Sequence, residues 1–250
     1  MQLLKYTGET LGLVNEALSR FVALKSEGNN FVAPFILFKK GNETITTQLE
    51  TFSEECIGGI LETCDFTVNG FVLAGETQLL DKTGKEQHFF VLKLVVDGLE
   101  NVYVYSVPFS PGMNHKDLFN LTPRFAGSEP NGFFPSKSIK GEESSCNALK
   151  MDDLAPYDYR AAFLIGHFDE TRLWHDTRTI ISDTYCKLAF DKQRRYEFIF
   201  EISKFGEMTE TMKEEFNRLN TFFTKNFASL FSHIKSAVCL ENTASIYNMN

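Results

Sequence analysis

FTVNGFVLAGETQLLDKTGKEQHFFVLKLVVDGLENVYVYSVP, residues 66–108, contains three apolar, β-branched and aromatic runs separated by two polar segments. The polar segments, residues 81–85 and 97–101, are rich in residues that favour tight turns. Gly84 can adopt the positive φ that such a turn needs without steric cost. The pattern therefore predicts an antiparallel meander. Its three strands are expected at residues 66–80, 88–96 and 102–108.

The residues before this stretch predict two helices and a hairpin. Apolar side chains at helical spacing over residues 10–25, followed by Gly28, predict a first amphipathic helix. Residues 31–38 and 44–49 predict the two strands of a hairpin, and Ser53 is expected to start a second, short helix. The first part of the chain therefore has the order α-β-β-α-β-β-β, which is typical of an α+β layer with an antiparallel sheet.

The last third of the chain predicts a second sheet and a long helix. Apolar side chains recur every three or four residues from Met212 to Ile234, which indicates a long C-terminal helix. A second β-meander is predicted from four runs, residues 161–168, 173–182, 185–190 and 195–203. The predicted fold class is α+β, with two halves that each combine an antiparallel sheet with helices.

A long connection separates these two halves. Residues 110–158 contain five of the seven prolines, which interrupt regular structure. Connections of this length are usually functional or linkers, and the aromatic side chains favour an ordered excursion. We therefore divide the chain into residues 1–109, the connection 110–158 and residues 159–250. The first and last parts form either two domains or one continuous domain.

Composition disfavours several classes of protein. The 43% hydrophobic and 23% charged content is typical of a globular protein. A formal net charge of −8 repels nucleic acid, although an acidic face attracts a basic protein. The five cysteines are scattered without a Cys-x-x-Cys pair, and no apolar run has the length of a signal peptide or a membrane span. We expect a cytoplasmic protein that binds neither nucleic acid nor membrane.

Residues 167–176, HFDETRLWHD, concentrate two histidines, several carboxylates and the only tryptophan. The pattern predicts a hairpin tip. A three-residue turn at residues 169–171 would place His167 and His175 on the same face of the hairpin, roughly 7 to 8 Å apart. A two-residue or four-residue turn would place them on opposite faces, because side chains alternate along a strand.

The three-residue turn would create a candidate metal site. His167, Asp169 and His175 are residue types that bind zinc and other divalent ions. Glu170 or Asp176 would then act as general base in a metal-dependent hydrolase, with the metal lowering the pKa of a bound water. The alternative is a solvated acidic turn that binds no metal.

The sequence favours a non-catalytic protein that acts through a protein–protein interface, such as an inhibitor or an immunity-type binder. The acidic charge and the many aromatic residues support this hypothesis. The candidate partner-binding residues are Phe125, Phe133, Phe134 and Trp174. One alternative is the metal-dependent hydrolase, whose divalent ion would be the only cofactor. The other is a small-molecule-binding protein with a pocket between the two halves.

Overall fold

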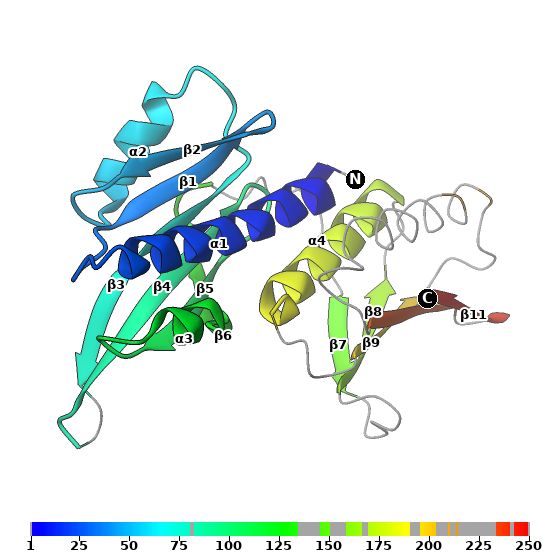
Figure 1. The fold of residues 1–250 in the computed structure, drawn as a ribbon. Coiled ribbons are helices and arrows are strands. Elements are labelled where there is room, and N and C mark those ends of the chain that lie inside the picture. The colour runs from blue at the N-terminus through cyan, green and yellow to red at the C-terminus, as the bar shows by residue number, and fades with distance from the viewer. Residues whose placement is uncertain are drawn as a thin grey trace. The chain divides into compact units, whose positions relative to one another are not determined.

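Two compact units make up the chain, and each is considered by itself. The first consists of residues 2–137 and 182–190, and the second of residues 1, 138–181 and 191–250. The computed structural model (Figure 1) describes residues 2–80, 83–134, 146–150, 159–166, 170–190, 196–203, 210, 214, 234–240 and 243–249.

The first unit is built on a six-stranded antiparallel sheet in the order β2-β1-β3-β4-β5-β6. Its strands are β1 (Phe35–Lys40), β2 (Glu43–Gln48), β3 (Gly70–Leu80), β4 (Glu86–Val96), β5 (Asn101–Phe109) and β6 (Arg124–Pro130). The predicted hairpin is confirmed as β1 and β2, and the predicted meander as β3, β4 and β5. Gly84 has the expected positive φ, 77°.

Helices cover both faces of this sheet. α1 (Gln2–Ser26) lies on one face, where Phe21 stacks on Phe90 of β4 with ring centroids 4.2 Å apart. α2 (Glu54–Thr63) starts at the predicted cap Ser53, whose side chain accepts from the backbone N–H of Cys56. Ile57 of α2 packs into a core cluster on the opposite face, with Phe71 of β3. The predicted order α-β-β-α-β-β-β is therefore confirmed.

α1 begins at Gln2, earlier than the predicted residue 10. Its first turns continue the same buried face, since Leu4 and Thr7 are both fully buried. The Thr7 hydroxyl donates to the carbonyl of Leu3 at 2.8 Å, so this polar group is satisfied inside the helix. The periodicity of the sequence is weaker here because a threonine occupies an inward position.

The first part of the predicted connection belongs to this unit. Residues 115–119 form the short helix α3 (His115–Phe119), and β6 pairs along β5 from Asn101↔Pro130 to Ser106↔Arg124. β6 carries an irregularity near Gly127, where the pairing shifts register. Residues 124–130 therefore form an edge strand of the first sheet.

The predicted strands over residues 173–182 and 185–190 are wrong, because this segment forms α4 (Glu170–Leu188). Local β-branched and aromatic residues resemble strands there, but the buried positions have helical spacing. Ile181 and Ser182 are both buried, and so are Tyr185 and Cys186 four residues later, a pattern that one face of a helix buries and one face of a strand does not. The hairpin tip predicted over residues 167–176 is corrected in the same way, since α4 begins at Glu170.

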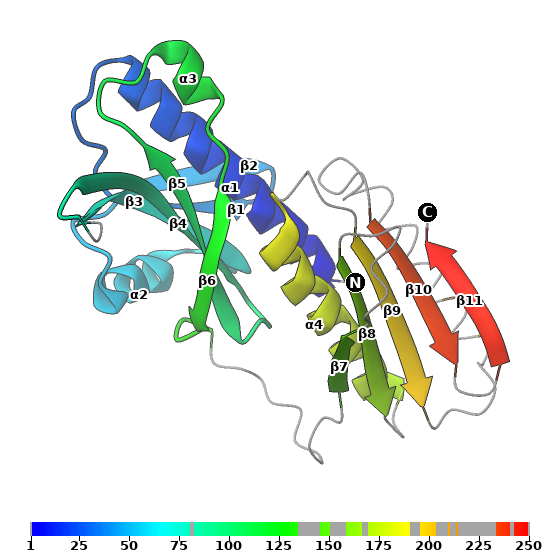
Figure 2. The same ribbon diagram turned by 90° about the horizontal axis from the view of Figure 1, so that it is seen from below.

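The second unit contains a five-stranded sheet in the order β11-β10-β9-β8-β7, as Figure 2 shows. Its strands are β7 (Cys146–Lys150), β8 (Tyr159–Gly166), β9 (Tyr196–Ser203), β10 (Ile234–Leu240) and β11 (Thr243–Met249). β8, β9 and β10 are parallel neighbours, whereas the two outer pairs are antiparallel. A meander cannot join parallel strands, so the predicted second meander is replaced by a β8-α4-β9 crossover.

The predicted long C-terminal helix is not supported. Its final residue, Ile234, begins strand β10, and the chain continues into β11. Helical backbone is described at Glu210 and Glu214, and the predicted span between residues 215 and 233 lies outside the described residues. None of the helices in the described part of the chain is long and apolar enough to cross a membrane.

Candidate functional site at the hairpin end of the first sheet

One end of the six-stranded sheet, which we call the hairpin end, is formed where β3 turns into β4 and where β5 ends (Figure 1). The register pairs Leu80 with Glu86 and His88 with Phe109. The last residues of β3 and β5 therefore lie beside the first residues of β4. Gly84 in the intervening turn has the positive φ that a tight reversal requires.

A rigid turn follows β5 and forms one wall of the hairpin end. Met113 N–H donates to the carbonyl of Ser110 at 3.2 Å, closing a four-residue turn. Pro111 presets φ at the second position, and Gly112 adopts φ +79° at the third, as a type II turn requires. Pro108 lies beyond Ser106, where the pairing with β6 ends, so its missing N–H disrupts no bond of that ladder.

The short helix α3 forms the next part of the wall. Asn114 caps it, since its side-chain oxygen accepts from Asp117 N–H at 2.9 Å. Leu118 points inward and is 5% exposed, whereas Phe119 is 65% exposed. The Phe119 ring contacts the imidazole of His115, with ring centroids 4.6 Å apart. In α3, Leu118 is therefore buried against the core, and the next residue, Phe119, exposes its ring to solvent.

The C-terminal end of α1 forms the opposite wall. Gly28 has φ +88°, and its N–H donates to the carbonyl of Lys25 at 3.0 Å. Asn29 N–H donates to the carbonyl of Leu24 at 3.2 Å. These two bonds define a Schellman motif, which explains why the glycine predicted to end the helix does so.

A buried ion pair joins this helix end to the sheet. Lys25 Nζ lies 2.6 Å from Glu76 Oε1 and donates to the carbonyl of Asn30 at 2.8 Å. The same carboxylate oxygen accepts from Val32 N–H at 2.9 Å. The two side chains of the pair are 11% and 7% exposed, and the Lys25 ammonium lies 5.3 Å from the ring centroid of Phe109. Lys25 thereby fixes the loop after α1 against β3 and β5.

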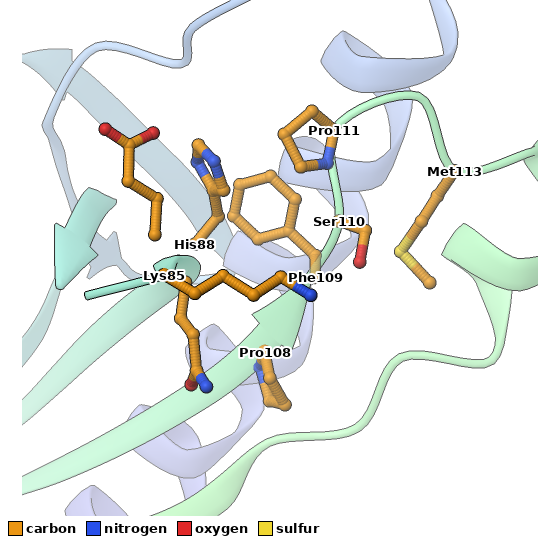
Figure 3. Close-up of a pocket in the computed structure, with 9 residues that line it drawn as sticks. Lys85, His88, Pro108, Phe109, Ser110, Pro111 and Met113 are labelled. Carbon is orange, nitrogen blue, oxygen red and sulfur yellow. The ribbon is translucent and has the colours of Figure 1, made fainter. Parts of the chain in front are cut away.

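Two adjoining pockets open at the hairpin end. Their volumes are about 810 Å³ and about 300 Å³, and both are lined by His88, Phe109, Ser110, Pro111 and Met113. Lys85, Glu86, Gln87 and Pro108 complete the larger pocket. Figure 3 shows the His88 imidazole beside the Phe109 ring, with the Lys85 side chain extending past that ring. The linings are therefore mixed. Phe109, Pro111 and Met113 give both pockets an apolar part, and polar or charged side chains line much of the rest.

Exposed apolar side chains gather around these pockets. Leu79 and Leu80, the last residues of β3, are 58% and 70% exposed. Phe31 is 60% exposed and directly precedes Val32, which is hydrogen-bonded to Glu76. Phe119 is a further exposed apolar side chain at this end, and Leu79 and Leu80 point to opposite faces of the sheet. Such a concentration of exposed large apolar groups typically marks an interaction site.

A separate cluster of titratable groups lies where the end of α4 packs on β5. Tyr103 OH donates to Asp183 Oδ1 at 2.7 Å, and Tyr105 OH donates to the carbonyl of Cys186. Burial raises the pKa of Tyr103, Tyr105 and Tyr185, and of the Cys186 thiol. A thiol needs its anionic form to react as a nucleophile, so this environment makes Cys186 a packing residue.

The predicted metal ligands are only partly described. His175 lies in α4 and is partly buried, and Glu170 and Asp176 belong to the same helix. His167 and Asp169 lie outside the described residues. The proposed three-residue turn is not formed, since the helix includes two of its residues. Within the described part of the chain, no three histidine, cysteine or carboxylate side chains form a potential metal site.

The predicted partner-binding residues have different environments. Phe125 on β6 is 39% exposed and contacts the ring of Tyr105. Phe133 and Phe134 pack against Phe71, with ring centroids 5.3 and 5.9 Å away, so they contribute to the core on the α2 side. Trp174 belongs to α4, and its side chain is not among the described ones.

Sequence reasoning missed the residues that form the hairpin end. Only Leu80 could have been found from the sequence. It is the second of two adjacent leucines at the end of a strand, and alternation points them to opposite faces of the sheet, so that both faces present a leucine where no helix covers the sheet. His88 and Phe109 gave no such signal, because they are twenty-one residues apart and meet only through the β4–β5 register.

Comparisons with protein-family models, with curated proteins and with solved structures found no match to this chain.

Proposed function

We propose that this protein is a non-catalytic acidic protein that acts through a protein–protein interface at the hairpin end. The observation that carries the proposal is the exposure of Phe31, Leu80 and Phe119 near two pockets that share the apolar side chains of Phe109, Pro111 and Met113. Leu79 adds an exposed apolar side chain on the opposite face of the same strand end. Side chains of this kind, exposed at 58% to 70%, leave apolar surface in contact with water. A partner that covers them gains roughly 25 cal/mol for each Å² removed from water.

The walls of the site support recognition rather than nonspecific adhesion. The Schellman motif, the type II turn and the buried Lys25–Glu76 pair hold three different segments in fixed positions. A preorganised surface loses little conformational entropy on binding, so more of the contact energy appears as affinity. The net charge of −8 favours a basic partner, and blocking such a partner would be an inhibitor-type or immunity-type role.

Affinity capture from native lysate with matched variants tests this function. We expect wild-type protein to recover a stoichiometric partner, and Leu80→Asp or Phe119→Asp to lose it, because a carboxylate replaces an apolar contact. Phe125→Ser should keep the partner, since Phe125 lies on β6 outside the pocket walls. Equal capture by wild type and Leu80→Asp would refute the hairpin end as the interface.

A cytoplasmic location is part of the proposal. Cys56, Cys64 and Cys186 are free thiols among the described cysteines, which agrees with a reducing compartment.

Small-molecule binding is a second candidate function. The two pocket volumes lie within the roughly 300 to 1,000 Å³ typical of ligand sites. These pockets belong to the first unit, unlike the pocket expected between two halves. A thermal-shift screen of apolar metabolites tests this candidate. A true ligand would raise the thermal midpoint of wild type but not that of Met113→Trp. Met113 lines both pockets, so the larger tryptophan side chain would occupy the space that the ligand needs.

A further inference from the structure

We propose that the smaller pocket binds a small, uncharged, planar molecule with an amide-type hydrogen-bonding edge, such as an aromatic carboxamide or a heterocycle that contains a lactam. The proposal rests on the second candidate function, because it names the class of ligand for one of the two pockets. The floor, the buried charges and the walls of that pocket carry it. The exposed side chains of Leu80 and Phe119 are not part of the lining.

The floor of the smaller pocket is one row of side chains across three strands. The register pairs Gln78 of β3 with His88 of β4, and His88 with Phe109 of β5. Paired residues of an antiparallel sheet point to the same face, so an amide, an imidazole and a phenyl ring lie side by side. α1 covers the neighbouring row, where Phe21 stacks on Phe90, but its end leaves Gln78 exposed.

The polar groups of this floor are available to a ligand. Within the described part of the chain, the Gln78 amide and the His88 imidazole form no side-chain hydrogen bond to another residue. Glu76 lies two residues before Gln78 and lines the same pocket. Its bonds to Lys25 and Val32 both use Oε1, which leaves Oε2 as an acceptor. Donors and acceptors therefore lie next to aromatic rings, and a planar amide can satisfy them with its N–H and C=O groups.

The buried charges select against a charged ligand. Lys25 and Glu76 neutralise each other at 2.6 Å, and the ammonium also lies 5.3 Å from the ring centroid of Phe109. A cationic ligand would therefore meet Lys25 where it needs the carboxylate and the face of the ring. An anionic ligand would meet the Glu76 carboxylate, and the net charge of −8 opposes it further. A neutral polar molecule avoids both repulsions.

The size and the walls of the pocket suit a single ring. Its volume, about 300 Å³, is at the lower end of the roughly 300 to 1,000 Å³ of ligand sites. The Schellman motif at Gly28 and the type II turn at Gly112 hold the two walls before a ligand binds. The rings of His88 and Phe109 (Figure 3) are inclined by 53° with centroids 5.7 Å apart. A flat ring can therefore stack on one of them and meet the edge of the other.

Benzamide is the simplest probe of this class, and NMR titration of the isotope-labelled full chain measures its binding. We expect saturable shifts of the backbone amides of Gly28, Gly112 and Met113, with a dissociation constant in the millimolar range or below. Three molecules with the same ring are the controls: benzoate is an anion, benzylamine is a cation and toluene has no hydrogen-bonding group. Each should bind about tenfold more weakly than benzamide, because it lacks the amide bonds or carries an unbalanced charge.

Gln78→Leu tests the polar floor. The leucine removes the amide, so benzamide should bind about tenfold more weakly, whereas toluene should bind no more weakly than to wild type. The Gln78 side chain is exposed, so the variant should keep its circular dichroism and thermal midpoint. Gln48→Leu at the exposed end of β2 is the matched control. Gln48 lines neither pocket, so this variant should bind benzamide like wild type.

Three results would overturn this class of ligand: no saturable benzamide shifts at the pocket, a control molecule that binds wild type as tightly as benzamide, or normal benzamide binding by Gln78→Leu. The candidate functions fail separately. An apolar metabolite that stabilises wild type but not Met113→Trp would retain small-molecule binding and remove only the amide class. Capture of a protein partner is lost or kept in Leu80→Asp whatever benzamide does, because Leu80 is not part of the pocket lining.

Discussion

At the scale of single residues, the Lys25–Glu76 pair connects the fold to the candidate site. Its groups are almost fully buried, and their remaining bonds go to backbone atoms of the loop after α1. Removing a charge from water is costly, so this arrangement is stable only while both partners are present. The pair therefore holds the C-terminal end of α1 and the loop after it against β3.

Glu76→Ala should lower the free energy of unfolding by about 3 to 5 kcal/mol, because it leaves the Lys25 ammonium buried without its carboxylate. The double variant Lys25→Met/Glu76→Leu should recover most of that loss, since neither charge is then buried. Urea unfolding followed by circular dichroism measures both. The exposed pair Lys5 and Glu9 is the control, and Glu9→Ala should cost less than about 1 kcal/mol.

At the scale of elements, close contact between α1 and the sheet depends on a glycine at the start of β3. A Cβ at Gly70 would collide with the Thr10 hydroxyl and lie 3.0 Å from the carbonyl oxygen of Val95. The hydroxyl is buried and held by its hydrogen bond to Tyr6, so it cannot move aside easily. The distance between helix and sheet is therefore set by the absence of a side chain.

Gly70→Ala should destabilise the protein by about 1 to 3 kcal/mol, because the helix must move away from the sheet. Thermal unfolding and urea unfolding both report this loss.

The same substitution at two other glycines provides the controls. Gly75→Ala meets the outer end of the Phe52 ring, which is 40% exposed and can rotate away, so its effect should be small. Gly12→Ala lies inside α1 with open space around the new methyl group, and should stabilise by about 0.5 to 1 kcal/mol. Equal losses at all three positions would contradict a packing origin.

At the scale of the whole molecule, the first unit includes residues 182–190, a segment that lies far from residues 2–137 in the sequence. The last turns of α4 bury Tyr185 and Cys186 and accept hydrogen bonds from Tyr103 and Tyr105 of β5. Folding therefore brings three tyrosine hydroxyls into a region where ionisation is disfavoured, and burial raises the pKa of each. The fold should therefore lose stability when the pH becomes alkaline enough to ionise tyrosines in the unfolded chain.

The free energy of unfolding should fall steeply above about pH 10. Below that pH the phenols are neutral in both states, so their full contribution is present. Above it, the unfolded chain loses these protons while the folded chain retains them, which costs up to about 1.4 kcal/mol per pH unit for each tyrosine. Absorbance at 295 nm should show these phenols ionising together with the loss of circular dichroism.

Tyr105→Phe removes one of these phenols, so the free energy of unfolding should fall less steeply with pH above about pH 10, by up to about 1.4 kcal/mol per pH unit. It should also cost about 1 kcal/mol at neutral pH, through the lost bond to the Cys186 carbonyl. Ionisation of all eight tyrosines while the fold remains intact would contradict the prediction.

Local patterns in the sequence determined the order of elements in the first unit. Period-two and period-3.6 patterns, the Ser53 cap and the glycines at 28 and 84 act over a few residues, so they could be interpreted without the fold. Only the tertiary structure decided the conformation of residues 170–188. Its local β-branched residues resemble strands, but burying the adjacent pairs Ile181–Ser182 and Tyr185–Cys186 on one face requires a helix.

The candidate site was likewise decided by tertiary structure. Its walls come from the end of α1, the β3–β4 hairpin and the turn after β5, segments that no local pattern relates to one another. Strand register and the buried Lys25–Glu76 pair bring them together. The sequence by itself determined which segments become strands and helices, because those preferences are local. The hairpin end exists only in the fold, because it depends on which strands become neighbours and at what register.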